Sequence, residues 1–208
     1  MTRDSSTPTL ILLLGSYDPE TKRVLYEIRE HIARSFHEHV YGMLLERLEM
    51  YDCVRDGQPH VLMVECGEEP AAYLFTPTGQ LLDAIPLEST GPEGAGEAAR
   101  KLGLELRFRL PVLEELSALA HFPDLLTMVV RHRELTRCGE YIELVFLLTQ
   151  GVEPRRVVFL WNVNVPISTM LRELLDRYNF NLRTYKDERE LLEETHRLVY
   201  YAVRGRGG

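Results

Sequence analysis

The sequence predicts an α/β protein with a doubly wound, mainly parallel sheet of the Rossmann/flavodoxin-like kind and an inserted antiparallel β-hairpin region. Continuous apolar runs at residues 9–15 and 157–161 are typical of strands that are buried on both faces. Amphipathic helical patterns follow these runs. Residues 40–87 instead carry short strand-like runs separated by turn residues. We therefore expect residues 1–208 to form a single α/β domain, with 40–87 as a β-rich insertion.

The first strand, residues 9–15, is expected to lead into a helix. Asp18 can cap that helix, and Pro19 suits its first position. In the following 40–87 region the sequences RDGQP and TPTGQ supply turns, and YLFTPTGQLLDAI predicts a hairpin. The apolar residues between 44 and 50 fit either a strand or an extension of a helix.

The alternation of strands and helices is expected to return near residue 104. ESTGPEGAG is interpreted as a loop, and EAARKLG as a short helix that Gly103 closes. Ser168 is expected to cap the helix that follows it, and Asp187 and Glu190 have the spacing of a capping box at the start of the last helix. Strands are predicted at 104–111, 124–130, 157–161 and 182–185, and helices at 112–122, 139–150, 168–179 and 188–203.

Composition and net charge disfavour several classes of function and several kinds of site. The net charge of −8 disfavours general binding to nucleic acids or anionic membranes, which requires clustered Lys and Arg. Three cysteines without a CxxC motif argue against a disulfide framework and favour the cytoplasm. The seven histidines form no HExxH motif or Cys/His cluster, so no metal is expected. No membrane span and no organic cofactor are predicted.

Three loops should meet at the carboxyl edge of the sheet, where ligands bind in folds of this class. The first carries Ser16, Tyr17 and Asp18 beside a helix N-terminus. The second is the basic sequence RHRELTRCGE, which could hold a phosphate or remain solvated. The third carries Asn162 and Asn164, whose amides could bind a base or sugar or simply form a turn.

The helix predicted in CGEYIELVFLLTQG is apolar almost all round, which is typical of a buried helix, yet it carries Glu143. Gly139 would let a ligand come close to its first turn. Glu143 lies near the positive helix end, where a carboxylate stays ionised. Such a carboxylate could attack a sugar anomeric carbon, although acidic residues also occur in first turns for dipole reasons alone.

The segment FPDLLTMVVRHRELTRCGEYIELVFLLTQG resembles nucleoside 2-deoxyribosyltransferase-like proteins, a Rossmann-like group related in architecture to TIR domains. Asp124, Gly139 and Glu143 follow that group's order of a strand led by Asp, a glycine and a nucleophilic Glu. ILLLGSYDPETKRVLYEIREHI is similar to the group's first strand, loop and helix. The resemblance covers about half of the chain in two blocks. It implies Glu143 as nucleophile and a nucleoside or nucleotide as ligand.

The chain departs from this pattern at Arg137, where catalytic members carry an acid six residues before the Glu. Two hypotheses therefore stand. One is an enzyme that cleaves or transfers an N-glycosidic bond, with Ser16, Tyr17, Asp18, Gly139, Asn162 and Asn164 near the substrate. The other is a non-catalytic nucleotide sensor in which Arg137 contributes to binding, or a protein-interaction module whose inserted strands form a homo-oligomer interface.

Overall fold

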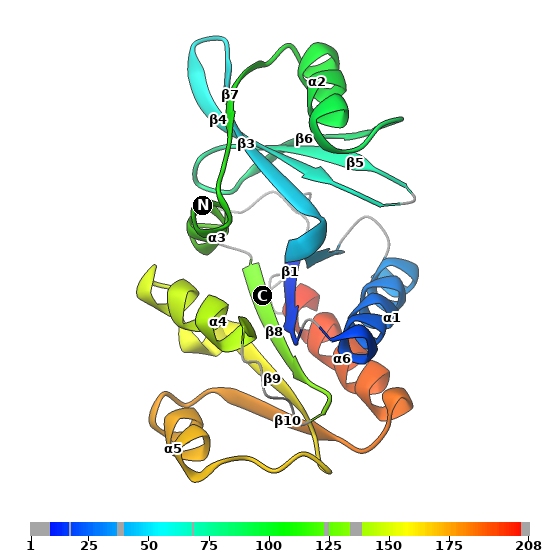
Figure 1. Cartoon of the computed structure of the whole chain (residues 1–208), viewed down its shortest axis with the longest axis vertical. Helices are drawn as coiled ribbons and strands as arrows, with labels where there is room; N and C mark the ends of the chain where they lie inside the picture. Colours follow the sequence, from blue (N-terminus) through cyan, green and yellow to red (C-terminus); the bar gives the residue numbers. More distant parts are fainter. Residues whose placement is uncertain are drawn as a thin grey trace. The chain divides into compact units, whose positions relative to one another are not determined.

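The structure is a computed structural model that describes residues 9–16, 18–36, 40–67, 69–122, 125–133 and 139–204. The chain divides into two compact units (Figure 1). One unit contains the chain up to Leu44 and from Asp124 onward, and the other is Leu45–Pro123. The second unit overlaps the insertion predicted at 40–87 and extends beyond its carboxyl end.

Within the described residues, the first unit contains a five-stranded parallel sheet in the order β10-β9-β8-β1-β2. The chain moves outward from β1 to β2, and after the second unit it returns to the other side of β1 and continues to β10. The strands are β1 (Thr9–Gly15), β2 (Val40–Leu44), β8 (Leu125–Arg131), β9 (Val157–Asn162) and β10 (Asn181–Tyr185).

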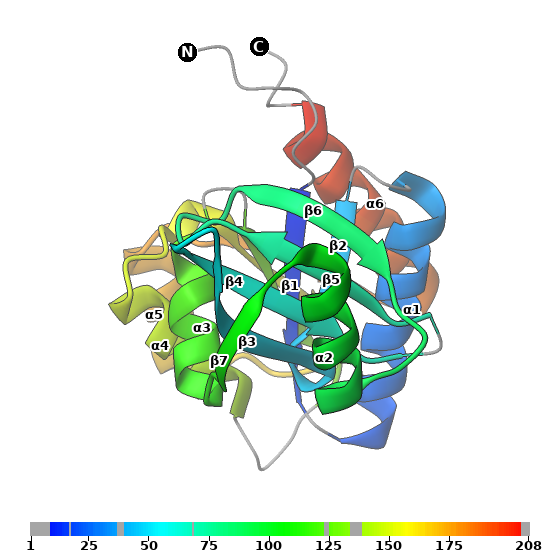
Figure 2. The same cartoon turned by 90° about the horizontal axis from the view of Figure 1, so that it is seen from above.

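Helices flank this sheet on both sides. Figures 1 and 2 both show α1 and α6 on one side of β1, and α4 and α5 on the other. The elements are α1 (Pro19–Phe36), α4 (Gly139–Thr149), the 3-10 turn η3 (Pro154–Arg156), α5 (Thr169–Arg177) and α6 (Glu188–Arg204). None of the helices within the described ranges is both long and apolar enough to cross a membrane.

The predicted helix caps are confirmed. The Asp18 carboxylate accepts hydrogen bonds from the backbone N–H groups of Glu20 and Thr21. The Ser168 hydroxyl accepts from the N–H of Leu171. At the start of α6, Asp187 accepts from the N–H of Glu190 while the Glu190 carboxylate accepts from the N–H of Lys186, so the capping pair reaches one residue further back.

Apolar residues of β1, β8 and β9 form the core of the first unit together with the inner faces of α1 and α6. On the other side, α4 buries Leu144 and Leu147. The prediction that α4 is a buried helix holds for one face only, because Ile142 is 72% and Val145 is 56% exposed. Both lie on its outward face, so apolar composition alone did not determine the burial of this helix.

The second unit is built on an antiparallel sheet of order β6-β5-β4-β3-β7 within the described residues. The predicted hairpin is the β5–β6 pair. The elements are η2 (Leu45–Arg47), β3 (Leu48–Arg55), β4 (Gln58–Glu65), β5 (Ala71–Phe75), β6 (Leu81–Pro86), α2 (Gly91–Leu102), β7 (Glu105–Arg109) and α3 (Val112–Ala120). Apolar residues of β3, β4 and β5 pack against Ala95 and Ala98 of α2.

Two predictions about this unit are wrong. The strand near residue 104 does not resume the parallel alternation, because β7 pairs antiparallel with β3. A strand pattern predicts extended backbone but does not identify the neighbouring strand. The segment GPEGAG is not a loop, because α2 begins at Gly91 with Pro92 in its first turn.

The packing around Gly94 explains why this helix carries a glycine in its first turns. A Cβ atom at Gly94 would lie 2.4 Å from the carbonyl oxygen of Ser89, whereas a Cβ at Gly96 would meet nothing within 4 Å. The helix therefore needs glycine at position 94 so that the preceding loop can fold back against it. The Glu97 carboxylate holds the same loop by accepting from the N–H groups of Glu88 and Ser89.

We predict opposite effects for two alanine substitutions in α2. Gly94→Ala should destabilise this unit by about 1–3 kcal/mol because of the clash with Ser89. Gly96→Ala, the matched control, should leave its stability unchanged or raise it by up to about 1 kcal/mol. Hydrogen–deuterium exchange of the α2 amides measures the stability change in each variant. Equal protection of these amides in the two variants would contradict the packing described for Gly94.

Candidate functional site

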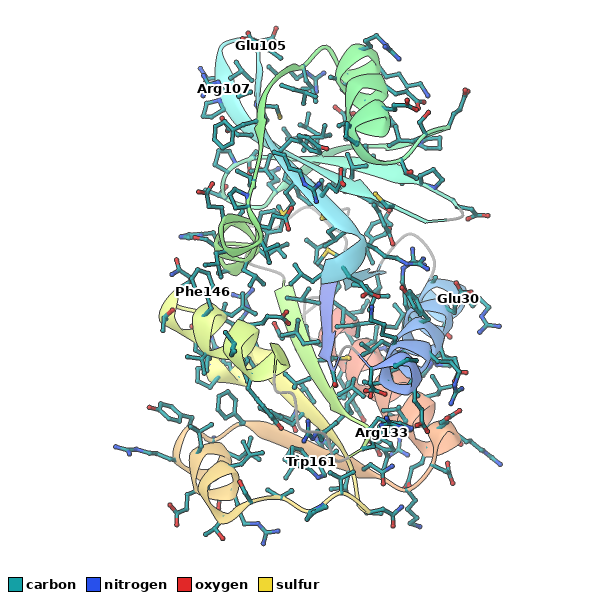
Figure 3. All side chains as sticks on the ribbon, in the orientation of Figure 1. Glu30, Glu105, Arg107, Arg133, Phe146 and Trp161 are labelled. Carbon is teal, nitrogen blue, oxygen red and sulfur yellow. The ribbon has the colours of Figure 1, made fainter. Side chains whose placement is uncertain are left out.

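The carboxyl ends of the parallel strands lie at one level of the sheet. Gly15 of β1 is opposite Val130 of β8, and Arg131 of β8 is opposite Trp161 of β9. Figure 3 shows Arg133 and Trp161 near this edge. Residues that follow β1, β8 and β9 are therefore neighbours in space although they are far apart in sequence.

The end of β1 places Ser16 and Asp18 at this edge. A Cβ atom at Gly15 would lie 3.0 Å from Leu25 and 3.1 Å from Thr21, so glycine allows α1 to pack closely against the strand end. Ser16 is buried. Burial opposes ionisation of Asp18, but hydrogen bonding from Thr21 and the charge of Arg133 hold the pKa of its carboxyl below the ordinary value.

Asp18, Glu20, His132 and Arg133 form a charged group that we call the edge cluster. The Arg133 Nε atom lies 3.3 Å from Oδ1 of Asp18, and the Arg133 guanidinium also pairs with Glu20. The His132 Nε2 atom lies 3.8 Å from Oε1 of Glu20. The cluster thus joins the first turn of α1 to the residues that follow β8.

A second group of side chains lies beside the cluster. Arg131 belongs to β8 and is buried, so it is not part of the solvated loop that the sequence allowed. Its guanidinium carbon lies 5.8 Å from the ring centre of Tyr141 and 6.0 Å from that of Trp161, within the range of cation–π attraction. The Trp161 ring N–H donates to the carbonyl oxygen of Val165.

Glu143 lies in the second turn of α4, which begins at Gly139. Its side chain is partly exposed, while its Oε2 atom is buried. On this mostly apolar helix the Glu143 carboxylate therefore lies at the border of the packed face. Burial of one oxygen restricts the directions from which a substrate could approach it.

Asn162 and Asn164 form a local turn at the end of β9. The Asn162 side-chain oxygen accepts from the N–H of Asn164, and the Asn162 carbonyl accepts from the N–H of Val165. Asn164 is exposed. These bonds agree with the interpretation that this loop is a turn. The Oδ1 atom of Asn162 already accepts a hydrogen bond from the backbone of the turn.

Tyr17, Asp124 and Arg137 lie outside the described residues, so the structure places only some of the predicted site. It also adds Glu20 and Tyr185, which the sequence interpretation did not select. Glu20 looked like an ordinary first-turn acid, and only the register that brings β8 beside β1 gives it Arg133 and His132 as neighbours.

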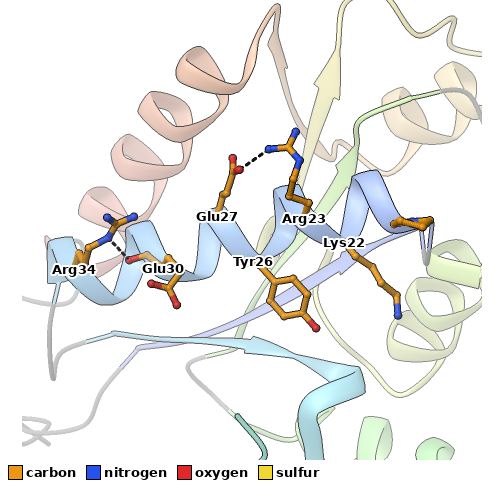
Figure 4. A pocket seen from close by; sticks show the side chains of 7 residues that line it. Lys22, Arg23, Tyr26, Glu27, Glu30 and Arg34 are labelled. Carbon is orange, nitrogen blue, oxygen red and sulfur yellow. Dashed lines mark hydrogen bonds and ion pairs between the residues drawn. The ribbon is translucent and has the colours of Figure 1, made fainter. Parts of the chain in front are cut away.

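Two surface hollows lie along α1, and neither is lined by residues of the edge cluster. One, of about 560 Å³, is lined by α1 side chains that include Lys22, Tyr26 and Glu30 (Figure 4). The other, of about 510 Å³, lies between α1 and α6 and includes His31 and His196. Within the described ranges, no group of three or more His, Cys, Asp or Glu side chains is arranged for a metal ion.

Comparison with known proteins adds no further constraint: no family model, no curated protein and no solved structure matches the chain.

We predict that Asp18 stabilises the first unit through its cap and its charge separately. Asp18→Ala should lower the unfolding free energy by about 1 kcal/mol because the cap is lost, whereas Asp18→Asn keeps the cap and should cost less. Because the folded-state pKa of Asp18 is lowered, its charge stabilises the fold at neutral pH, and that contribution is lost as the pH falls below about 4.

Urea unfolding followed by the fluorescence of Trp161, the single tryptophan of the chain, measures these effects in the first unit. Ser168→Ala, which removes the cap of α5, is the matched control and should cost a similar amount without changing the acid dependence. Equal losses for Asp18→Ala and Asp18→Asn would contradict the role of the cap.

Proposed function

We propose that this chain is a nucleoside- or nucleotide-binding protein whose ligand lies at the carboxyl edge between β1 and β8. The observation that supports this most is the strand order, which runs outward from β1 to β2 and then from β8 to β10 on the opposite side. This is the order of a doubly wound, flavodoxin-like sheet. In such sheets ligands bind where the strand order reverses, outside the carboxyl ends.

The charges of the edge cluster favour a nucleoside over a polyphosphate. Two carboxylates, Asp18 and Glu20, face the guanidinium of Arg133, so the described groups supply no excess positive charge. Carboxylates are suited to accept hydrogen bonds from sugar hydroxyls, as an acidic residue does for the ribose in dinucleotide-binding folds. We therefore favour recognition of the sugar over recognition of phosphate.

A ligand could displace the ion pairs of the edge cluster at a small energetic cost. The Arg133 side chain is 46% exposed and that of Glu20 is 49% exposed. An exposed ion pair of this kind contributes about 0–1 kcal/mol, so its displacement by a ligand costs little. Asp18 is 13% exposed and is held by the α1 cap, which makes it the fixed partner of the group.

Cleavage or transfer of an N-glycosidic bond, with Glu143 as nucleophile, is the second candidate function. It is supported by the resemblance of the segment around Gly139 and Glu143 to nucleoside 2-deoxyribosyltransferase-like proteins, and by the partial exposure of Glu143 near the start of α4. Because the Oε2 atom of Glu143 is buried, a substrate has little access to it, and this favours binding without catalysis. A sensor needs no chemistry at this carboxylate.

Thermal unfolding with adenosine, deoxyadenosine and ATP tests the binding proposal. At a concentration 100 times the Kd, a nucleoside should stabilise the fold by about 2.7 kcal/mol, which corresponds to a rise in Tm of about 5–10 °C. Asp18→Ala should reduce the shift, and Ser168→Ala should not. The binding proposal fails if no compound raises the Tm, and the preference for the sugar over phosphate fails if ATP raises the Tm more strongly than either nucleoside.

Incubation with the nucleosides that stabilise the fold separates the two candidates, with free nucleobase measured by chromatography. Release that Glu143→Gln abolishes while the Tm shift persists would support the nucleophile. Stabilisation without any release of base would leave a binding protein and exclude glycosidic cleavage of those nucleosides.

A further inference from the structure

The hydrogen bonds of Tyr185 determine which nitrogen of His132 carries a proton. Tyr185 is 1% exposed, and its hydroxyl donates to the carbonyl oxygen of Arg131 at 3.1 Å. The same hydroxyl oxygen lies 3.2 Å from Nδ1 of His132. A carbonyl has no proton to give, so both contacts can be hydrogen bonds at once only when the single phenolic proton points to Arg131. In that arrangement the Tyr185 oxygen accepts from His132, which places a proton on Nδ1.

The alternative of an ionised Tyr185 is excluded by its surroundings. Burial, together with the nearby charge of Glu188, raises the pKa of its phenol well above the ordinary value. The rings of His132 and Tyr185 are also stacked, with an interplanar angle of 13° and centres 6.3 Å apart. Packing and the hydrogen bond thus hold the imidazole in one orientation.

In a neutral imidazole with its proton on Nδ1, Nε2 carries a lone pair. That atom faces Oε1 of Glu20 at 3.8 Å, which is too long for a hydrogen bond. Glu20 lies at the start of α1, and the same carboxylate pairs with Arg133. The lone pair of His132 is therefore directed toward Glu20 of the edge cluster, and the charge of Glu188 also acts on the ring.

We propose that Nε2 of His132 is a hydrogen-bond acceptor of this site, held in that role by Tyr185. The proposal rests on the proposed function, because the donor is a sugar hydroxyl or a ring N–H of the bound nucleoside. The donor keeps its proton and points it at the lone pair of Nε2, while the Nδ1–H of the same ring remains on the Tyr185 oxygen.

The free protein gives the first test, which requires no ligand. Long-range ¹H–¹⁵N correlation spectra of the ¹⁵N-histidine-labelled protein at pH 8 should show His132 protonated at Nδ1 and unprotonated at Nε2. His60 and His121 are internal controls for this pattern, because their Nδ1 atoms lie 2.8 and 2.7 Å from the carbonyl oxygens of Gln58 and Ser117. Tyr185→Phe should leave both controls unchanged and turn His132 into a mixture of tautomers.

A wild-type His132 that is protonated at Nε2, or that already shows mixed tautomers, would overturn the proposal whether or not any ligand binds.

Titration with adenosine is the second test. The ¹⁵N resonance of His132 Nε2 should shift as it accepts a hydrogen bond, while those of His60 and His121 stay in place. If adenosine raises the Tm but leaves Nε2 unmoved, the proposal fails and the binding function stands. If no nucleoside raises the Tm, the binding function fails and the acceptor role of Nε2 fails with it, while the spectra of the free wild type and Tyr185→Phe still decide whether Tyr185 places the proton on Nδ1.

Discussion

The parallel pairing of β1 with β8 is the constraint on which the site depends. These strands are distant in sequence, and the entire second unit is inserted between β2 and β8. Their register brings the residues that follow Gly15 to the level of those that follow Val130. Close packing of α1 over Gly15 then fixes Asp18 as both helix cap and partner of Arg133. A slip of this register would separate the two halves of the edge cluster.

The apolar helix α4 shows how a carboxylate is accommodated on the packed side of the sheet. Glu143 lies at the border between the buried residues Leu144 and Leu147 and the exposed face that carries Ile142 and Val145. A carboxylate in such a position avoids the full cost of burying a charge, because part of the side chain reaches solvent. The same position suits either a structural role or chemistry at one oxygen, which is why α4 alone does not determine the function.

Local signals in the sequence predicted most of the helices and strands, and the N-terminal caps of several helices. Asp18, Ser168 and Asp187 cap the helices that their spacing predicted, because capping depends only on residues within one turn. Pairing between distant strands was not predictable in the same way. For that reason β7 was assigned to the wrong sheet, and Glu20 and Tyr185 were missed, since their roles arise only when β8 and β10 reach the same edge as β1. The second half of α2 was predicted, but its first turns from Gly91 were taken as a loop because glycines favour loops, and only the close approach of Ser89 shows why Gly94 stands in the helix.

We propose that ligands bind where the ends of β1 and β8 meet, and backbone amide shifts measured on titration with adenosine test this site most directly. We expect the largest shift changes at Ser16, Asp18 and residues 131–133. Changes confined to the unit Leu45–Pro123, or to the hollow between α1 and α6 that includes His31 and His196, would contradict it.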